Sequence, residues 1–148
     1  IRLRIPDVTI TTDVIAGFPG ESDEEFIETY DFISKIRFSS IHVFPFSIRP
    51  GTKAEYMSGQ IQKSVKKDRV VRLINLGNRL KNDYVKSFIG KETMILLEDK
   101  NEKGIVSGFN PQYLRVNTTA DKDILGKLKK VMITGVENNI LGGIIVKE

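Results

Sequence analysis

Two short segments of this 148-residue chain carry the residue types that line ligand sites. Residues 13–21 read DVIAGFPGE, and residues 42–52 read HVFPFSIRPGT. In the first segment, Gly17, Pro19 and Gly20 break an apolar run just before a helix start, where free backbone amides can bind a carboxylate or a phosphate. The Gly-Lys-Ser/Thr ending of a P-loop is absent, so the alternative is a plain turn between a strand and a helix.

The polar and aromatic side chains of these segments each have two interpretations. Asp13 lies within an apolar run, so its carboxylate must accept hydrogen bonds or face a cavity. Residues 44–47 (FPFS) could line a pocket for an adenine ring, or they could pack in a core. The Arg49 guanidinium could bind a phosphate or a carboxylate. The alternative is an arginine of the loop that is solvated and binds nothing. His42 is the only histidine and the chain has no cysteine, which argues against a metal site.

The elements that position these segments form a strand–helix–strand unit. Residues 8–18 predict a strand, and its continuous apolar end is typical of a strand covered on both faces. Ser22 and Glu25 form a capping box at the start of a helix that runs to about Arg37. Residues 40–46 predict a second, parallel strand, as in a βαβ unit. Because so small a unit leaves open strand edges, we expect it to need more sheet and the isolated chain to self-associate.

A long helix and a set of short strands follow. The helix is predicted over residues 63–88, with its basic side chains, Arg69 among them, outside a buried stripe of Val70, Leu73, Ile74, Gly77, Leu80, Tyr84 and Phe88. Five short apolar stretches separated by turn residues come next, at residues 93–97, 104–108, 113–117, 131–136 and 141–146. They predict a small antiparallel β-barrel of the oligonucleotide-binding kind.

Composition narrows the classes of protein that fit. The proportions of 40% hydrophobic and 28% charged residues are those of a soluble globular protein. No apolar run approaches the ~20 residues that span a bilayer. Without cysteine the chain can hold neither a disulfide nor a thiolate-bound cluster. Net charge is −3 over residues 1–55, +7 over 56–91 and zero over 92–148, so the basic middle predicts either a phosphate-binding surface or a solvated helix face.

The predicted barrel contains an aromatic group with basic neighbours. Phe109, Tyr113 and Arg115 lie on or beside one strand, and Lys127, Lys129 and Lys130 come later. Barrels of this kind bind RNA by stacking bases on aromatic side chains next to cations. The alternative is that Tyr113 belongs to the core.

Residues 13–21 and 42–54 resemble, in order and spacing, the late part of the radical S-adenosylmethionine barrel in the methylthiotransferases that modify transfer RNA. Residues 42–54 look most like the branch that acts on threonylcarbamoyladenosine, while the isopentenyladenosine and ribosomal-protein branches look similar. The chain from Lys91 onward is similar to a TRAM domain, an RNA-binding barrel. The resemblance implies an α/β plus all-β fold: residues 1–62 as the C-terminal part of the radical barrel, 63–90 as a basic connecting helix, and 91–148 as the TRAM barrel.

The resemblance also implies an activity. Such an enzyme uses S-adenosylmethionine and two 4Fe-4S clusters to add a methylthio group to C2 of a hypermodified adenosine. The S-adenosylmethionine pocket would be walled by Asp13, Gly17, Pro19, Gly20, Pro45, Phe46 and Ser47. The RNA would be contacted by Arg49, Tyr113, Arg115, Lys127, Lys129 and Lys130.

The chain departs from the family in one respect: it lacks the CxxxCxxC triad and the N-terminal cysteines. We therefore expect a fragment without catalytic or metal-binding residues that is inactive alone. Its expected partners are transfer RNA and the missing N-terminal part of its own polypeptide, in the cytoplasm and away from membranes. The alternatives are a free-standing RNA-binding module without chemistry and an enzyme of the ribosomal-protein branch.

Overall fold

The computed structural model describes residues 1–120 and 124–146. The chain divides into two compact units. One unit is Ile10–Lys81, and the other combines Ile1–Thr9 with Asn82–Glu148. The first contains both ligand-type segments, and the second contains the predicted barrel. The assignment of residues 1–62, 63–90 and 91–148 to a barrel end, a connecting helix and a TRAM domain stays a prediction.

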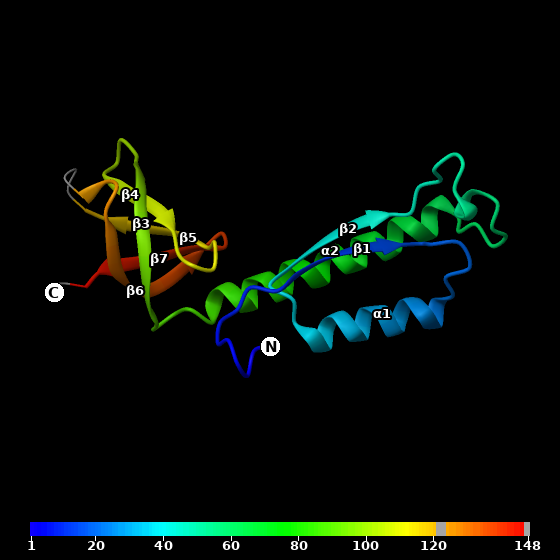
Figure 1. Ribbon diagram of the computed structural model, residues 1–148, viewed down its shortest axis with the longest axis horizontal. Coiled ribbons are helices and arrows are strands. Elements are labelled where there is room, and N and C mark those ends of the chain that lie inside the picture. Colours follow the sequence, from blue (N-terminus) through cyan, green and yellow to red (C-terminus); the bar gives the residue numbers. More distant parts are fainter. Residues whose placement is uncertain (121–123, 147–148) are drawn as a thin grey trace. The chain divides into compact units, whose positions relative to one another are not determined.

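The first unit begins with the predicted strand–helix–strand arrangement (Figure 1). Strand β1 (Thr11–Ala16) pairs in parallel with β2 (Ser40–Pro45), and α1 (Asp23–Ile36) connects them. The helix starts at a complete capping box, because the Ser22 side chain accepts from the Glu25 amide and the Glu25 carboxylate accepts from the Ser22 amide. It ends at Arg37 in the left-handed conformation, whose amide donates to the Ile33 carbonyl. The predicted capping box and helix end are confirmed.

The long helix α2 (Lys63–Lys86) follows a short 3-10 turn, η1 (Lys53–Glu55). Its buried stripe differs from the prediction: Ile74 is 43% exposed, and the buried positions in the first unit are Arg69, Leu73, Leu76, Gly77 and Leu80. Gly77 is needed there because a Cβ atom would lie 2.6 Å from Cγ1 of Ile41 on β2. No helix among residues 1–120 and 124–146 is long and apolar enough to cross a membrane.

Both helices cover the same face of the two-stranded sheet. Ala16 packs in one cluster with Phe26 and Ile33 of α1 and with the leucines of α2. On the opposite face Ile15 is 57% exposed and Phe44, its neighbour across the strands, is 50% exposed. The prediction that β1 is covered on both faces is therefore wrong for this chain. The reason is that its described residues supply helices for one face only.

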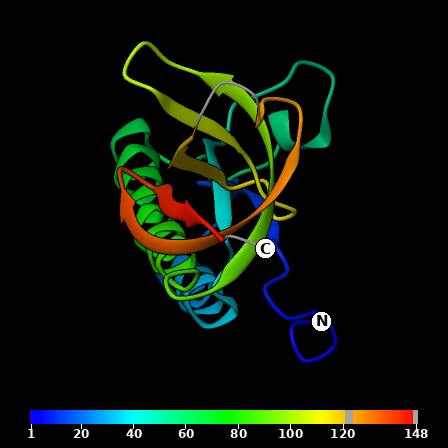
Figure 2. The same cartoon turned by 90° about the vertical axis from the view of Figure 1, so that its left-hand side faces the viewer.

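The second unit contains a closed barrel with strand order β3-β4-β5-β7-β6 (Figure 2). The strands are β3 (Glu92–Lys100), β4 (Ile105–Phe109), β5 (Arg115–Thr119), β6 (Leu128–Glu137) and β7 (Ile140–Ile145). Four neighbouring pairs are antiparallel, but β5 and β7 run parallel. The prediction of a purely antiparallel barrel is wrong at this pair, because strand direction cannot alternate all the way around a closed ring of five.

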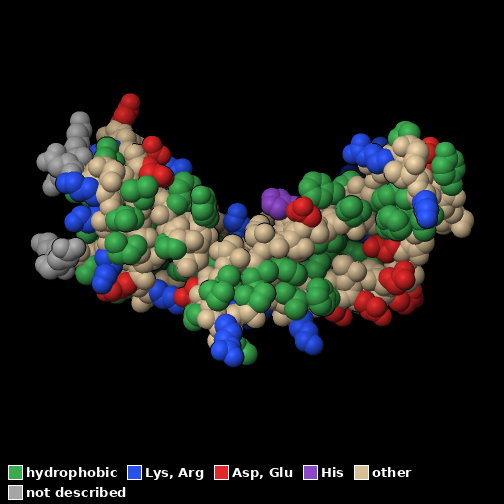
Figure 3. Space-filling model, in the orientation of Figure 1, with side chains coloured by type: hydrophobic (Ala, Val, Ile, Leu, Met, Phe, Trp, Pro, Cys, Tyr) green, Lys and Arg blue, Asp and Glu red, His purple; other side chains and the backbone are tan. Residues whose placement is uncertain are grey.

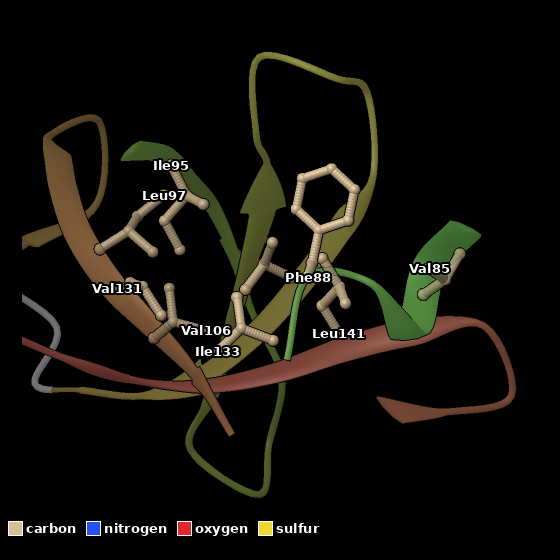
Figure 4. Close-up of a cluster of buried hydrophobic side chains, with 9 residues drawn as sticks. Val85, Phe88, Ile95, Leu97, Val106, Val131, Ile133 and Leu141 are labelled. Carbon is tan, nitrogen blue, oxygen red and sulfur yellow. The ribbon is translucent and has the colours of Figure 1, made fainter. Parts of the chain in front are cut away.

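The barrel core is formed by alternate residues of its strands and by the end of the long helix (Figure 4). Ile95 and Leu97 of β3 are fully buried, as are Val131 and Ile133 of β6. Phe88, just after α2, is 2% exposed and packs among them. The burial of every second residue along β3 and β6 is typical of a sheet with one buried face.

Candidate functional site

The two ligand-type segments meet at one rim of the sheet, where both strands end. The Phe46 amide, just past β2, donates to the Ala16 carbonyl at the end of β1 at 2.8 Å. The Phe18 and Phe46 rings then touch edge to face, with centroids 5.1 Å apart. The carboxyl ends of parallel strands are the usual place for a ligand in an α/β sheet. Tertiary structure thus brings Gly17–Gly20 and Pro45–Ser47 together.

The backbone amides of the first loop are already hydrogen-bonded within the chain. The Gly17 amide donates to the Glu21 carboxylate at 2.7 Å, and the Gly20 amide donates to the Gly59 carbonyl at 2.9 Å. An added phosphate or carboxylate would have to displace Glu21 from the amide that it occupies. The loop is therefore preorganised by its own anion, and a ligand would meet its surface rather than these amides.

Arg69 of α2 holds the loop in place through hydrogen bonds to Glu21 and Asp23. Its guanidinium donates to the carbonyl and the carboxylate of Glu21 and, at 2.7 Å, to the carboxylate of Asp23. Arg69 is only 4% exposed, and its charge lies 5.3 Å from the centre of the Phe26 ring. Burial acts to lower the pKa of Arg69, but hydrogen bonds to Asp23 and Glu21 outweigh it and the pKa is raised. The guanidinium is thus a permanent cation beneath the rim.

The sequence prediction missed Arg69 because it counted every basic residue of the helix as solvated. A signal was present: Arg69 precedes Leu73, Leu76 and Leu80 at helical spacing, so it occupies the apolar stripe. A charge in that stripe needs a buried partner. The acidic cluster at the start of α1 supplies it.

Lys66, one turn earlier on α2, joins the two strand ends. Its ammonium lies 5.1 Å from the centre of the Phe46 ring and donates to the Phe46 carbonyl at 3.3 Å. Its aliphatic stem passes so close to Gly17 that a Cβ atom there would lie 2.5 Å from Lys66 Cγ. Gly17 also has φ +78°, a conformation that favours glycine. One face of α2 therefore determines the geometry of the rim.

On the barrel, the side chains of Phe109 and Tyr113 are neighbours, and Tyr113 lies outside the core. The Phe109 and Tyr113 rings have centroids 5.9 Å apart, and Tyr113 is 85% exposed. Arg115 pairs with Phe109 across β4 and β5 and donates to the Ser107 hydroxyl at 2.8 Å. It also lies 3.7 Å from the Asp99 carboxylate. The alternative that Tyr113 belongs to the core is wrong.

The three predicted lysines do not share one surface. Lys130 lies opposite the exposed Met94 of β3 and 3.5 Å from the Glu92 carboxylate, so it is on the outside of the barrel. Lys129 lies opposite the fully buried Ile95 and so points to the other side of β6. Lys127 is exposed just before the strand.

Comparison with known proteins identifies relatives of the chain. No protein-family profile matches it. Over 90% of its length it is 39% identical to the threonylcarbamoyladenosine tRNA methylthiotransferase MtaB of Bacillus subtilis, of which it covers 30%. Over 78% of its length the chain is 43% identical to the MtaB protein of Thermotoga maritima, and it covers 26% of that protein. Over 99% it is 39% identical to a tRNA-2-methylthio-N(6)-dimethylallyladenosine synthase of Acetivibrio thermocellus, of which it covers 31%.

Over most of its length the chain is thus homologous to tRNA methylthiotransferases. It spans only 26–31% of the length of these curated relatives. The resemblance found in residues 13–54 is thereby confirmed at the level of the family.

The remaining predicted site residues of the first unit lie around the rim and on the bare face of the sheet. Asp13 is exposed there, directly across from His42, which appears as the single purple side chain of Figure 3. The expectation of a hydrogen-bonded or enclosed Asp13 is not met within this chain. Pro45 and Ser47 are exposed at the end of β2. Arg49 is exposed in the following loop, in the other unit from the barrel residues.

The residues present fit the two implied cofactors differently. For S-adenosylmethionine they offer an apolar rim, with Phe18 43% exposed, and the Ser47 hydroxyl. For an iron–sulfur cluster they offer no ligand, because the sequence has no cysteine. Within the described residues no group of three or more His, Asp or Glu side chains could hold a metal ion. The chain therefore has exposed apolar groups at the rim but no thiolate ligand for a cluster.

Proposed function

We propose that this chain is the C-terminal part of an enzyme that adds a methylthio group to C2 of threonylcarbamoyladenosine in transfer RNA. The observation that carries the proposal is the 39% identity, over 90% of the chain, to a protein named for that modification. The shorter match at 43% identity bears the same name. In such an enzyme S-adenosylmethionine and iron–sulfur clusters supply radical, sulfur and methyl chemistry, and the clusters would be held outside these residues.

A second substrate is supported by relatives of the other kind. The chain is 39% identical over 99% of its length to a protein named for methylthiolation of dimethylallyladenosine. Dimethylallyladenosine is more apolar than threonylcarbamoyladenosine, which carries a carboxylate. Arg49, exposed just past the rim, is the cation of this chain best placed in sequence to recognise such a carboxylate. We therefore prefer threonylcarbamoyladenosine.

The chain's own contribution is a cofactor wall and an RNA-binding barrel. The rim formed by Gly17–Gly20 and Pro45–Ser47 would face S-adenosylmethionine. The bare sheet face with Ile15 and Phe44 would line the interior of a larger barrel, which explains why apolar side chains are exposed there. Without cysteine the chain would be inactive alone, and the complete enzyme would act on transfer RNA in the cytoplasm.

The test of the proposed reaction is a nucleoside analysis. The complete reading frame that contains this chain is expressed in a bacterium lacking its own tRNA methylthiotransferases. Liquid chromatography with mass spectrometry of digested transfer RNA should then show 2-methylthio-threonylcarbamoyladenosine. Methylthiolated dimethylallyladenosine in its place would support the second substrate. If the protein carries its clusters and neither nucleoside is detected, both proposed substrates are contradicted.

We predict that the chain binds transfer RNA weakly and in a salt-sensitive manner, through cations of the barrel. Reversing the charge of Lys127, Lys129 and Lys130 to glutamate should lower the affinity roughly tenfold at low salt and flatten its dependence on salt, because phosphate contacts are lost. Fluorescence anisotropy with labelled transfer RNA measures both.

The matched control reverses three other exposed lysines, Lys35, Lys53 and Lys103. Since Lys129 points to the other side of β6 from Lys130, single reversals show which side the RNA uses. Equal affinities of the triple variant and the wild type would contradict RNA binding by this part of the barrel.

A further inference from the structure

The connection between β4 and β5 presents an aromatic side chain at the cost of backbone strain. Tyr113 has φ +61° and is 85% exposed. A bulky residue seldom adopts this left-handed conformation, which glycine or asparagine adopts more readily. Strain of this kind persists only where the surroundings impose it, and it concentrates at functional positions.

The surroundings that impose the strain are supplied by Asn110. Its side-chain oxygen accepts from the amides of Gln112 and Leu114, at 3.1 and 2.9 Å. Its backbone carbonyl accepts from the Tyr113 amide at 2.9 Å, and its amide donates to the Leu114 carbonyl. Asn110 itself is only 4% exposed. Asn110 therefore holds the backbone of this loop through hydrogen bonds, with the Tyr113 ring exposed to solvent.

The outward ring stands beside an open hollow of about 370 Å³. Besides Tyr113 the hollow is lined by Ile5, Pro6, Val8, Thr9, Pro111 and Gln112. The wall formed by residues 5–9 is attached to the barrel by two contacts. The Thr9 hydroxyl donates to the Gln112 carbonyl, and the Lys91 ammonium lies 2.6 Å from the Asp7 carboxylate. Mostly apolar walls with a few polar groups are typical of a small-molecule or nucleobase site.

Phe109 and Arg115 lie near Tyr113 and are not part of the lining of the hollow. Phe109 is 40% exposed, with its ring tilted 38° from that of Tyr113. The Arg115 side chain, 46% exposed, follows two residues later and is held by Ser107. A planar base can stack on such rings while the guanidinium lies near its phosphate. An aliphatic side chain of a peptide could pack on the rings, but it carries no negative charge for the Arg115 guanidinium to bind.

We infer that Tyr113, Phe109 and the adjacent hollow form a stacking site for one unpaired nucleobase of an RNA strand, with Arg115 beside the phosphate. The inference rests on the proposed RNA binding and narrows it to a loop or single-stranded region. It also explains why a strained tyrosine stands where asparagine or glycine would be easier. An unpaired base exposes the ring face that the site needs, whereas a duplex hides it.

The test uses the full chain and three probes: an unstructured oligoadenylate RNA, an abasic oligonucleotide of equal length, and transfer RNA. Tyr113→Gly removes the ring and relieves the strain. It should lower affinity for oligoadenylate and transfer RNA about fivefold or more, leave binding of the abasic strand unchanged, and raise the melting temperature. Tyr113→Phe should retain affinity. Tyr56→Ala removes an equally exposed tyrosine, at 80%, from the other unit and should change nothing.

A second readout does not depend on how the glycine variant folds. The chain has no tryptophan, so Tyr113→Trp places a single reporter in the site. Oligoadenylate should quench its fluorescence, and the abasic strand should not. Equal quenching by both, or unchanged affinity of Tyr113→Gly while the triple lysine variant binds less, would overturn the stacking site and leave RNA binding intact. Failure of the wild type to bind any probe would overturn both.

Discussion

Replacing Arg69 with methionine should lower the free energy of unfolding of the Ile10–Lys81 unit by about 3 kcal/mol, because removing one partner of a buried ion pair leaves the other charge uncompensated. The stranded group is Glu21, whose side chain is only 14% exposed. Asp23 is 83% exposed and should contribute little, since water can solvate it. Arg69→Lys should recover only part of the loss, because an ammonium cannot make the forked contact with both carboxylates.

Hydrogen–deuterium exchange of the full chain measures this effect, since peptides from each unit report separately. In Arg69→Met the peptides over residues 13–26 and the first turns of α2 should lose protection, while those of the barrel should not. Arg79→Met is the matched control: Arg79 is exposed on the same helix, and its loss should change stability by no more than about 0.5 kcal/mol. Equal effects of the two variants would contradict the role given to Arg69.

Replacing Gly108 with alanine should destabilise the barrel unit by about 3 kcal/mol, near the upper end of the cost of overpacking. A Cβ atom at Gly108 would collide with the carbonyl oxygen of Leu96 and lie 2.7 Å from its carbonyl carbon. These are backbone atoms of the neighbouring strand β3, at a pair next to the register shift between Leu97 and Asp99. Neither strand can retreat without losing hydrogen bonds of the closed ring.

Gly135→Ala on β6 provides the comparison. Nothing lies within 4 Å of a Cβ atom built there, so the change should be neutral or stabilising by roughly 0.5 kcal/mol. Exchange of the β3 and β4 amides should accelerate in Gly108→Ala and stay unchanged in Gly135→Ala. If Gly108→Ala retained wild-type protection, the close approach of β3 and β4 would be contradicted.

The two proposed sites lie in different units of the chain: the rim in the first and the stacking site in the second. In the first, Arg69 and Lys66 hold both strand ends in place, so the proposed cofactor wall is built before any ligand arrives. The Glu21 carboxylate accepts from the Gly17 amide and so leaves it unavailable to an added anion, which favours the apolar part of a ligand at this rim. In the second, Asn110 holds Tyr113 outward. Both proposed sites thus depend on a rigid support rather than on a flexible loop.

The local features of the fold were predictable from sequence. The capping box at Ser22 involves residues three apart, so the pattern of side chains alone specifies it. The strand–helix–strand order and the five later strands follow from hydrophobic periodicity and turn residues in the same way. The resemblance carried by residues 13–54 identified the family, because those residues form one contiguous unit.

What depended on contacts far apart in the chain was not predictable. Arg69 looked solvated until α2 packed against Glu21, which lies 48 positions earlier. The parallel β5–β7 pair follows from closing an odd-numbered ring, and no single strand reveals that closure. The sequence by itself therefore determined which elements form and which proteins the chain is related to, since these depend on neighbours along the chain. Only the tertiary structure decided which charges are buried, which amides are occupied and which aromatic ring faces solvent, because burial is a property of the packed elements together.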